Sequence, residues 1–271
     1  MGKVAFITGA TRGIGKACAL RLARAGLDIA VAGRSVAERA ELPGTIHSAA
    51  EEIAALGVTA LPVQCNVVNQ ASIDAAVAKT LDAFGRIDAV VNNAGALWWR
   101  SLEETPMKRF DLVMNVNVRG AFAVTSGFLP TMRRQNSGHI IFMSPPIDTS
   151  ILAGHIAYQI SKFGMTMTAI GLGDELKGTG ISATALWPKT VIESAATVNF
   201  GMGTPAMWRK ADIVADALYE ILQRPEETRG MALIDEDFLR SVGYSDFEKY
   251  NCVEGGQPLE LTAGLMRIIR T

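Results

Sequence analysis

A tyrosine and a lysine stand four residues apart in Tyr158-Gln-Ile-Ser-Lys162. On a helix this spacing puts both side chains on one face, so the phenol and the ammonium group can meet. The reference pKa of tyrosine is about 10, and a neighbouring positive charge favours the phenolate. The pair therefore indicates proton transfer at Tyr158. Because such pairs also occur by chance on solvated helix faces, other motifs have to support this interpretation.

A glycine-rich turn follows the first apolar segment. Val4–Ile7 is predicted to be a buried strand, and it leads through Thr8-Gly-Ala-Thr-Arg-Gly-Ile-Gly15 into an amphipathic helix at about 16–25. Glycines permit positive φ angles and close backbone approach, and the first N–H groups of a helix point at an anion. A merely tight turn needs one glycine and does not explain the glycines at 9, 13 and 15. The motif predicts a diphosphate site.

The second strand, predicted at 27–32, ends in Gly33-Arg34. In dinucleotide-binding folds an acidic residue at this place holds the 2′-hydroxyl of the NAD ribose. Gly33 removes that acid, and Arg34 and Arg12 could instead surround a 2′-phosphate with charge-assisted hydrogen bonds. We therefore expect NADP(H) to be favoured over NAD(H). The alternative is that both arginines are solvated surface residues.

Further apolar segments continue the alternation of strands and helices. Strands are predicted at 61–65, 87–91, 139–143, 181–186 and 231–234, and helices at about 45–56, 70–84, 106–132, 155–177 and 211–222. This order predicts an α/β fold with a Rossmann-type, doubly wound parallel sheet in three α/β/α layers, as a single domain over 1–271. A substrate rim is expected at about 193–210, and a C-terminal tail without a motif at 235–271.

Polar residues follow the third and fourth strands. Asn66 and Val67 end the third, and the fourth leads into Asn92-Asn-Ala-Gly95. Ligands of doubly wound sheets bind at the carboxyl ends of the strands. We therefore expect the cofactor to lie along this edge, next to the glycine turn and Arg34.

Length and charge limit the class of protein. The 271 residues are enough for one α/β domain, and a net charge of -1 indicates no attraction to nucleic acid or acidic membranes. Three scattered cysteines and three histidines without ligand spacing predict neither disulfides nor a metal site, and they fit a cytoplasmic protein. No apolar run approaches the roughly 20 residues of a membrane span.

With these motifs in view, the chain resembles the short-chain dehydrogenase/reductase family over about residues 3–234. Thr8–Gly15 matches its glycine turn, Asn92–Gly95 its sheet-stabilising motif and Tyr158-x-x-x-Lys162 its active pair. Shorter segments, among them Ser144-Pro-Pro146 and Ala185-Leu-Trp-Pro-Lys-Thr190, are similar to the hydroxysteroid dehydrogenase-like branch. Some members of that branch carry a C-terminal sterol-carrier domain, which this sequence is expected to lack.

The resemblance implies an NADP(H)-dependent oxidoreductase that interconverts a carbonyl and a secondary alcohol. Tyr158 would be the general acid or base, and Lys162 would favour the phenolate and hydrogen-bond the nicotinamide ribose. Asn117 would bind a water of the proton relay; its alternative is a structural role that ties its helix to the sheet.

The resemblance also implies a cofactor site that extends beyond the glycine turn. After Pro188, Thr190 and Val191 would meet the nicotinamide carboxamide. The expected cofactor residues are Gly9, Thr11, Arg12, Gly13, Ile14, Gly15, Arg34, Asn66, Val67, Asn93, Ala94, Gly95, Tyr158, Lys162, Pro188, Thr190 and Val191.

One departure from the family concerns the serine that orients the substrate. It should fall thirteen residues before Tyr158, where this chain has Pro145. Ser144 is the nearest hydroxyl, but one step along a strand turns a side chain to the opposite face. Either the Pro-Pro corner re-aims Ser144, which makes it a candidate catalytic residue, or the carbonyl lacks a donor worth about 2.7–4 kcal/mol. A weakly catalytic or non-catalytic NADP(H)-binding sensor or partner subunit is therefore the alternative function.

A second departure is Lys189, where the family usually has glycine. Its charge near the nicotinamide either favours an acidic substrate or faces solvent.

The substrate and the assembly can be outlined more coarsely. A hydrophobic small molecule would suit aromatic and methionine residues expected at the cleft rim, with core or subunit packing as the alternative: Trp98, Trp99, Trp187, Met202, Met207 and Trp208. By the resemblance, the helices at 106–132 and 155–177 pair between subunits, which implies a homodimer or homotetramer.

Overall fold

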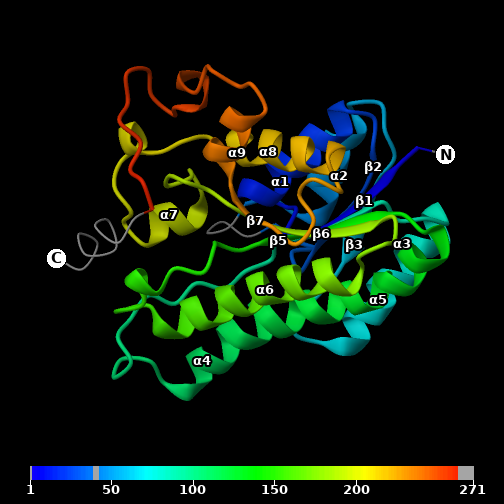
Figure 1. Cartoon of the computed structure of the whole chain (residues 1–271), viewed down its shortest axis with the longest axis horizontal. Helices are drawn as coiled ribbons and strands as arrows, with labels where there is room; N and C mark the ends of the chain where they lie inside the picture. Colours follow the sequence, from blue (N-terminus) through cyan, green and yellow to red (C-terminus); the bar gives the residue numbers. More distant parts are fainter. Residues whose placement is uncertain (1, 39–42, 262–271) are drawn as a thin grey trace.

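The computed structural model describes residues 2–38 and 43–261, and over these residues seven strands form one parallel sheet (Figure 1). The strands are β1 (Val4–Thr8), β2 (Asp28–Gly33), β3 (Ala60–Gln64), β4 (Ala89–Asn92), β5 (Gly138–Met143), β6 (Ile181–Trp187) and β7 (Ala232–Ile234). Their order is β3-β2-β1-β4-β5-β6-β7, so the winding direction reverses between β1 and β4. The predicted doubly wound sheet is confirmed.

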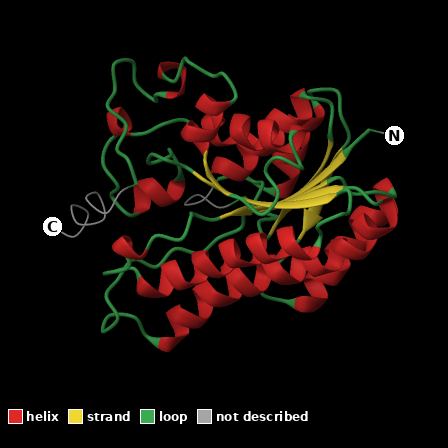
Figure 2. Ribbon diagram, in the orientation of Figure 1, coloured by secondary structure: helices red, strands yellow, loops and turns green. Residues whose placement is uncertain are grey.

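Helices cover both faces of the sheet (Figure 2). On one face lie α1 (Gly13–Arg24), α2 (Ile46–Ala54), α8 (Asp212–Gln223) and α9 (Asp235–Ser241); on the other lie α3 (Gln70–Phe84), α5 (Gly120–Gln135) and α6 (Ile156–Glu175). Successive side chains of a strand point to opposite faces, so each strand supplies two cores. In β1, Ala5 and Ile7 pack with α1 and α8, while Val4 and Phe6 pack with α3, α5 and α6.

The helix predicted over 106–132 consists of three consecutive pieces. A π-helical turn, η1 (Met114–Arg119), separates α4 (Met107–Val113) from α5. Such turns are rare and occur frequently at functional sites. Asn117 lies in this turn and is fully buried.

The whole run Met107–Gln135 is long and apolar enough to cross a membrane by length and composition alone. This corrects the expectation that no segment reaches that length. A core helix of a globular protein can be equally long and apolar. Here the run packs against α3 and α6.

The C-terminal region encloses the end of β6. The expected rim at 193–210 contains α7 (Ala195–Asn199) and a 3-10 turn, Pro205–Met207. The described part of the expected tail begins with α9, which packs on α8, continues through a second 3-10 turn, Glu248–Tyr250, and then turns back. Antiparallel bridges join Thr190 to Glu260 and Arg209 to Asn251. Residues 39–42 of the connector and 262–271 of the tail lie outside the described residues.

Candidate active site

The glycine turn between β1 and α1 has the backbone that its sequence predicts. Gly9 and Gly13 have φ angles of +68° and +54°, the left-handed region that favours glycine. A Cβ atom on Gly15 would collide with the Asn93 side chain and the Gly9 carbonyl. Because α1 begins at Gly13, N–H groups of its first turn lack partners within the helix and suit an anion.

Thr8 and Asn93 fasten this turn to the end of β4. The Thr8 hydroxyl accepts hydrogen bonds from the N–H groups of Asn93 and Ala94, at 3.0 and 2.9 Å. The Asn93 side chain donates to the carbonyl oxygens of Thr8 and Gly9, at 2.9 and 3.3 Å. These contacts hold the carboxyl ends of β1 and β4 together where the sheet reverses its winding.

A cleft of about 580 Å³ runs along the carboxyl ends of the first four strands. It is lined by every residue predicted for the adenosine and diphosphate parts of a cofactor, namely Gly9, Thr11, Arg12, Gly13, Ile14, Gly15, Arg34, Asn66, Val67, Asn93, Ala94 and Gly95. Ser35, Ser194, Asn199 and Phe200 also line the cleft and were not predicted as cofactor residues, although the last three fall in the expected substrate rim. They come from a loop and from α7 with its flanks, which carry no motif.

The two arginines predicted for a 2′-phosphate differ in their contacts. Arg34 is exposed and lines the cleft directly after Gly33. Arg12 donates to the carbonyl oxygens of Gly44 and Pro43, at 2.7 and 3.1 Å, and to the Ser35 hydroxyl at 3.2 Å. Arg12 therefore fastens the connector beside the cleft, and Arg34 is the better placed of the two to meet an anionic ligand.

Tyr158 and Lys162 lie together beside this cleft but are not among the residues that line it, and their exposures are only 8% and 4%. Lys162 Nζ donates to the Met143 carbonyl at 2.7 Å and lies 5.9 Å from the centre of the Tyr158 ring. A Cβ atom on Gly95 would be 3.7 Å from the same nitrogen, so the loop after β4 reaches this pair. Burial raises the pKa of Tyr158 above its ordinary value and lowers the pKa of Lys162 to about 7.

Asn117 joins the π turn to the same region. Its side-chain oxygen accepts from the Ala96 N–H at 2.8 Å, and its amide donates to the Ala96 carbonyl and the Ser161 hydroxyl, at 3.0 and 2.9 Å. These contacts tie the π turn to the loop after β4 and to α6, which is a structural role. The role of Asn117 in binding a relay water stays a prediction.

Ser144 faces α6, the helix that carries Tyr158 and Lys162. It continues the alternation of Ile140 and Phe142 toward the α6 face and is completely buried. Its hydroxyl lies 2.9 Å from the Thr166 hydroxyl, which also donates to the Pro145 carbonyl at 2.6 Å. The Ser144 hydroxyl is therefore engaged by Thr166, one turn along α6 from Lys162, and its role as a catalytic residue stays a prediction.

The segment after β6 supplies the remaining predicted cofactor residues, all of them buried. The Val191 N–H donates to the Leu259 carbonyl at 2.9 Å and is thus engaged by the tail. The Thr190 hydroxyl is buried and has no hydrogen-bond partner among the described residues. A buried hydroxyl in need of a partner, next to Pro188, fits the polar amide of a nicotinamide.

Aromatic rings lie close to Tyr158 and Lys162. The ring of Trp99 meets that of Tyr158 edge-on at 6.3 Å and lies 6.3 Å from Phe200. The ring of Trp187 lies 5.3 Å from Lys162 Nζ. Of the other predicted rim residues, Met202 and Trp208 form a cluster with Val191 against which Trp99 and Phe200 also pack. Met207 is exposed, and Trp98 donates to the Thr105 hydroxyl.

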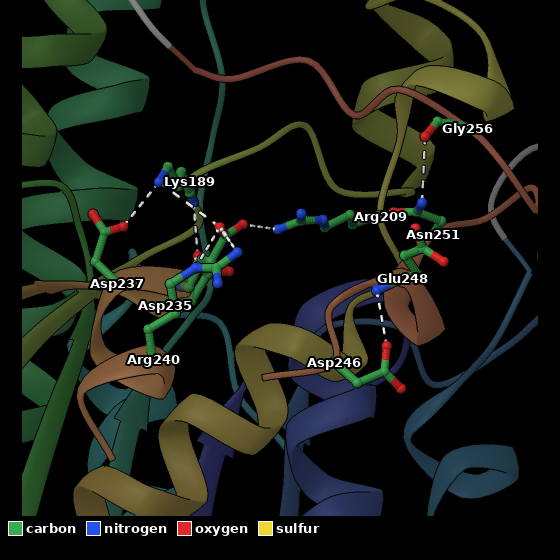
Figure 3. A network of polar contacts seen from close by, with 10 residues as sticks. Lys189, Arg209, Asp235, Asp237, Arg240, Asp246, Glu248, Asn251 and Gly256 are labelled. Atoms are coloured by element: carbon green, nitrogen blue, oxygen red, sulfur yellow. Dashed lines mark hydrogen bonds and ion pairs between the residues drawn. The ribbon is translucent and has the colours of Figure 1, made fainter. Parts of the chain in front are cut away.

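Lys189 has acidic partners that neither of its two expectations included. Its ammonium group contacts Asp237 at 2.8 Å and Glu236 at 3.8 Å, both on α9 (Figure 3). It is paired with acidic side chains of its own chain, in a network that sequence reasoning missed. Among the described residues, no three histidine, cysteine or acidic side chains are grouped as metal ligands.

Comparisons with known proteins agree with this geometry. A family model described as short chain dehydrogenase matches residues 3–200. Hydroxysteroid dehydrogenase-like protein 2 from Mus musculus is 42% identical over 261 residues, which cover 95% of this chain and 53% of the relative. The chain thus spans about half the length of that relative.

Solved structures of the same kind are similar over nearly the whole chain. A putative dehydrogenase from Xanthomonas campestris superimposes with a TM-score of 0.91, 40% identity and coverage of 96% of both chains. An alcohol dehydrogenase from the archaeon Thermococcus sibiricus, complexed with 5-hydroxy-NADP, gives a TM-score of 0.74 and 28% identity over 86% of this chain and 96% of that one. The resemblance inferred from the motifs is confirmed, and the chain belongs to the short-chain dehydrogenase/reductase family of oxidoreductases.

Proposed function

We propose that the protein is an NADP(H)-dependent oxidoreductase that interconverts a carbonyl and a secondary alcohol on a hydrophobic small molecule. The observation that carries the proposal is the buried Tyr158 and Lys162 pair next to Gly95, which lines a cleft whose residues fit a dinucleotide. A bound nicotinamide would supply or accept the hydride.

Tyr158 would hold and move the proton. Because burial raises the pKa of its hydroxyl, Tyr158 is protonated at neutral pH and can donate to a carbonyl oxygen. In the reverse direction a protonated Lys162 would favour the phenolate. With the pKa of Lys162 near 7, a modest electrostatic change at the site is enough to set its charge.

Arg34 supports a preference for NADP(H). It follows Gly33 at the end of β2, where no acidic side chain would repel a 2′-phosphate, and it faces the cleft. The related Thermococcus sibiricus enzyme was crystallised with an NADP derivative. The aromatic rings of Trp99 and Phe200 beside Tyr158 support an apolar substrate.

The test is NADPH oxidation with a panel of hydrophobic ketones. Tyr158→Phe should abolish turnover while NADPH binding, measured by fluorescence, survives. Tyr219→Phe is the matched control, because it keeps the ring on which Arg21 stacks at 3.7 Å, far from the cleft. Undiminished turnover in Tyr158→Phe would contradict the proposal.

A second candidate is a weakly catalytic or non-catalytic NADP(H)-binding sensor or partner subunit. It is favoured by Pro145 in place of the expected serine and by the burial of Ser144 against Thr166. Turnover of any ketone at about 1 per second, an ordinary rate for an enzyme, would rule it out.

We also propose a homodimer or homotetramer in the cytoplasm. Two apolar side chains on the outer face of α5 and α6, Phe122 and Met167, are 62% and 64% exposed beside a groove between these helices. A monomeric mass by light scattering at micromolar concentration would count against the assembly. Fractionation of cells would test the location, which rests on the three free cysteines.

A further inference from the structure

The segment Lys189–Val191, which follows β6, is held by its backbone on both edges. The Lys189 N–H donates to Asp235 Oδ1 at 2.8 Å, and the Lys189 carbonyl accepts from the Leu261 N–H at 2.8 Å. The Val191 N–H donates to the Leu259 carbonyl, and the Val191 carbonyl accepts from the Arg209 N–H, both at 2.9 Å. Between these anchored residues lies Thr190, whose buried hydroxyl has no partner among the described residues.

Of the four residues that hold this segment, Asp235 binds it through its side chain, whereas Leu259, Leu261 and Arg209 bind it through backbone groups. Asp235 directly follows β7, whose Ile234 pairs with Trp187 of β6, so the sheet register brings Asp235 beside Lys189. Its Oδ1 also accepts from the Glu236 N–H at 2.6 Å. Asp235 is completely buried, and burying a carboxyl group is costly unless its hydrogen bonds compensate.

An ionic cluster fixes α9, which begins at Asp235, against the same segment. Glu236 contacts Arg209, Arg240 at 2.8 Å and the Lys189 ammonium group at 3.8 Å (Figure 3). Burial would raise the pKa of Glu236, but the contacts with Arg209 and Arg240 outweigh it and hold that pKa below its ordinary value. Glu236 therefore stays ionised at neutral pH and keeps α9 in place.

We infer that Asp235 is a positioning residue: its hydrogen bond to the Lys189 amide sets the conformation in which Thr190 meets the nicotinamide end of the cofactor. Asp235 itself touches no reacting atom. The inference deepens the proposed function and rests on it for the identity of the ligand. The hydrogen bond from the Lys189 amide to Asp235 can be probed without any ligand.

The first measurement is hydrogen exchange of the Lys189 amide in the unliganded protein. Asp235→Ala removes the acceptor and should speed exchange by about 10-fold or more, the range for a lost hydrogen bond to a charged group. Asp235→Asn keeps an oxygen at the same place and should exchange nearly as slowly as the wild type. Asp237→Asn is the control, because Asp237 is exposed and contacts only the Lys189 side chain among the contacts described for it.

The second measurement separates the two ends of the cofactor. Asp235→Ala should weaken NADPH about 10-fold and leave 2′-phospho-ADP-ribose, which lacks the nicotinamide, bound as in the wild type. Asp235→Asn should restore NADPH affinity. If Asp235→Ala does not fold, Asp235→Ser replaces it, since a serine hydroxyl is too short to reach the Lys189 amide as the carboxylate does.

Unchanged exchange in Asp235→Ala, or an Asp235→Asn variant as fast as Asp235→Ala, would overturn the inference. Equal loss of NADPH and of the fragment would overturn it as well. If the wild-type protein binds neither compound, the proposed function fails, while the exchange of the Lys189 amide still decides whether Asp235 holds the segment.

Discussion

The two ends of the candidate cofactor site differ in the groups that form them. At the phosphate end, backbone groups and glycines of β1, α1 and β4 line an open cleft. At the chemistry end, Tyr158, Lys162 and Thr190 are buried side chains, each 8% exposed or less. They are enclosed by Trp99, α6 and a segment that the C-terminal tail anchors.

The two ends suit two different tasks, which are the binding of an anion and the transfer of a proton. An open row of backbone donors suits an anion that arrives from water, since the N–H groups of a helix start need no reorganisation to receive it. A proton donor benefits from the opposite environment, because excluding water strengthens each electrostatic interaction around it. Changes at one end should therefore leave the other end largely intact, and four measurements on three variants test this.

The largest effect is expected for Lys162→Met, which keeps a long apolar chain but removes the ammonium group next to Tyr158. Positioned acid–base groups contribute about 10²- to 10⁴-fold, so kcat/KM with NADPH and a ketone should fall by a factor in that range. Binding of 2′-phospho-ADP-ribose, measured by calorimetry, should not change. A fragment affinity that falls as far as the activity would show that the two ends are not separable.

Arg34→Asp should act at the phosphate end alone. A charge-assisted hydrogen bond is worth about 1.5–3 kcal/mol, so NADPH affinity should fall roughly 10- to 100-fold while NADH binds as well as before or better. Fluorescence titration with both cofactors measures this. Equal losses for NADPH and NADH would mean that Arg34 does not read the 2′-phosphate.

Gly15→Ala should cost stability as well as cofactor binding. Its Cβ would meet the Asn93 side chain and the Gly9 carbonyl, and overpacking of this kind costs about 1–3 kcal/mol. Gly171→Ala is the matched control within one subunit: it also lies in a helix, and nothing of its own chain stands within 4 Å of its Cβ position, although the residue lines the groove between α5 and α6. Urea denaturation should show Gly171→Ala to be neutral or up to about 1 kcal/mol more stable. A Gly15→Ala protein as stable as that control would show that the turn can relax.

The phosphate end was predictable from sequence because its residues act through local backbone. Gly9, Gly13 and Gly15 stand close together in one turn, and Asn93 follows a strand whose place in the sheet the alternation of elements predicts. Each position is constrained by a neighbour within the same motif. The doubly wound sheet and the cleft along its carboxyl edge followed from those constraints.

The chemistry end was predictable only in part. Tyr158 and Lys162 share a helix face, but the anchor at Val191 is a backbone bond to Leu259, and backbone groups carry no sequence signature. Asp235 meets Lys189 through the pairing of β6 with β7, 46 positions along the chain. The burial of Ser144 depends on Thr166, a contact that needs the packing of β5 on α6.

The last prediction concerns the pH dependence of folding stability in the unliganded protein. Burial lowers the pKa of Lys162 to about 7, whereas the unfolded lysine titrates near its model value of 10.5. Between these values the unfolded state binds more protons, so this group makes the protein more stable as pH rises from about 7, by at most about 1.4 kcal/mol per pH unit. Burial raises the pKa of Cys18, which acts in the opposite direction above pH 9.

The difference in stability between wild type and Lys162→Met, measured with urea at pH 7 and 9, isolates the contribution of the lysine. The wild type should gain relative to the variant across this interval; a constant difference would mean that Lys162 is not desolvated, and the contrast between the two ends would weaken.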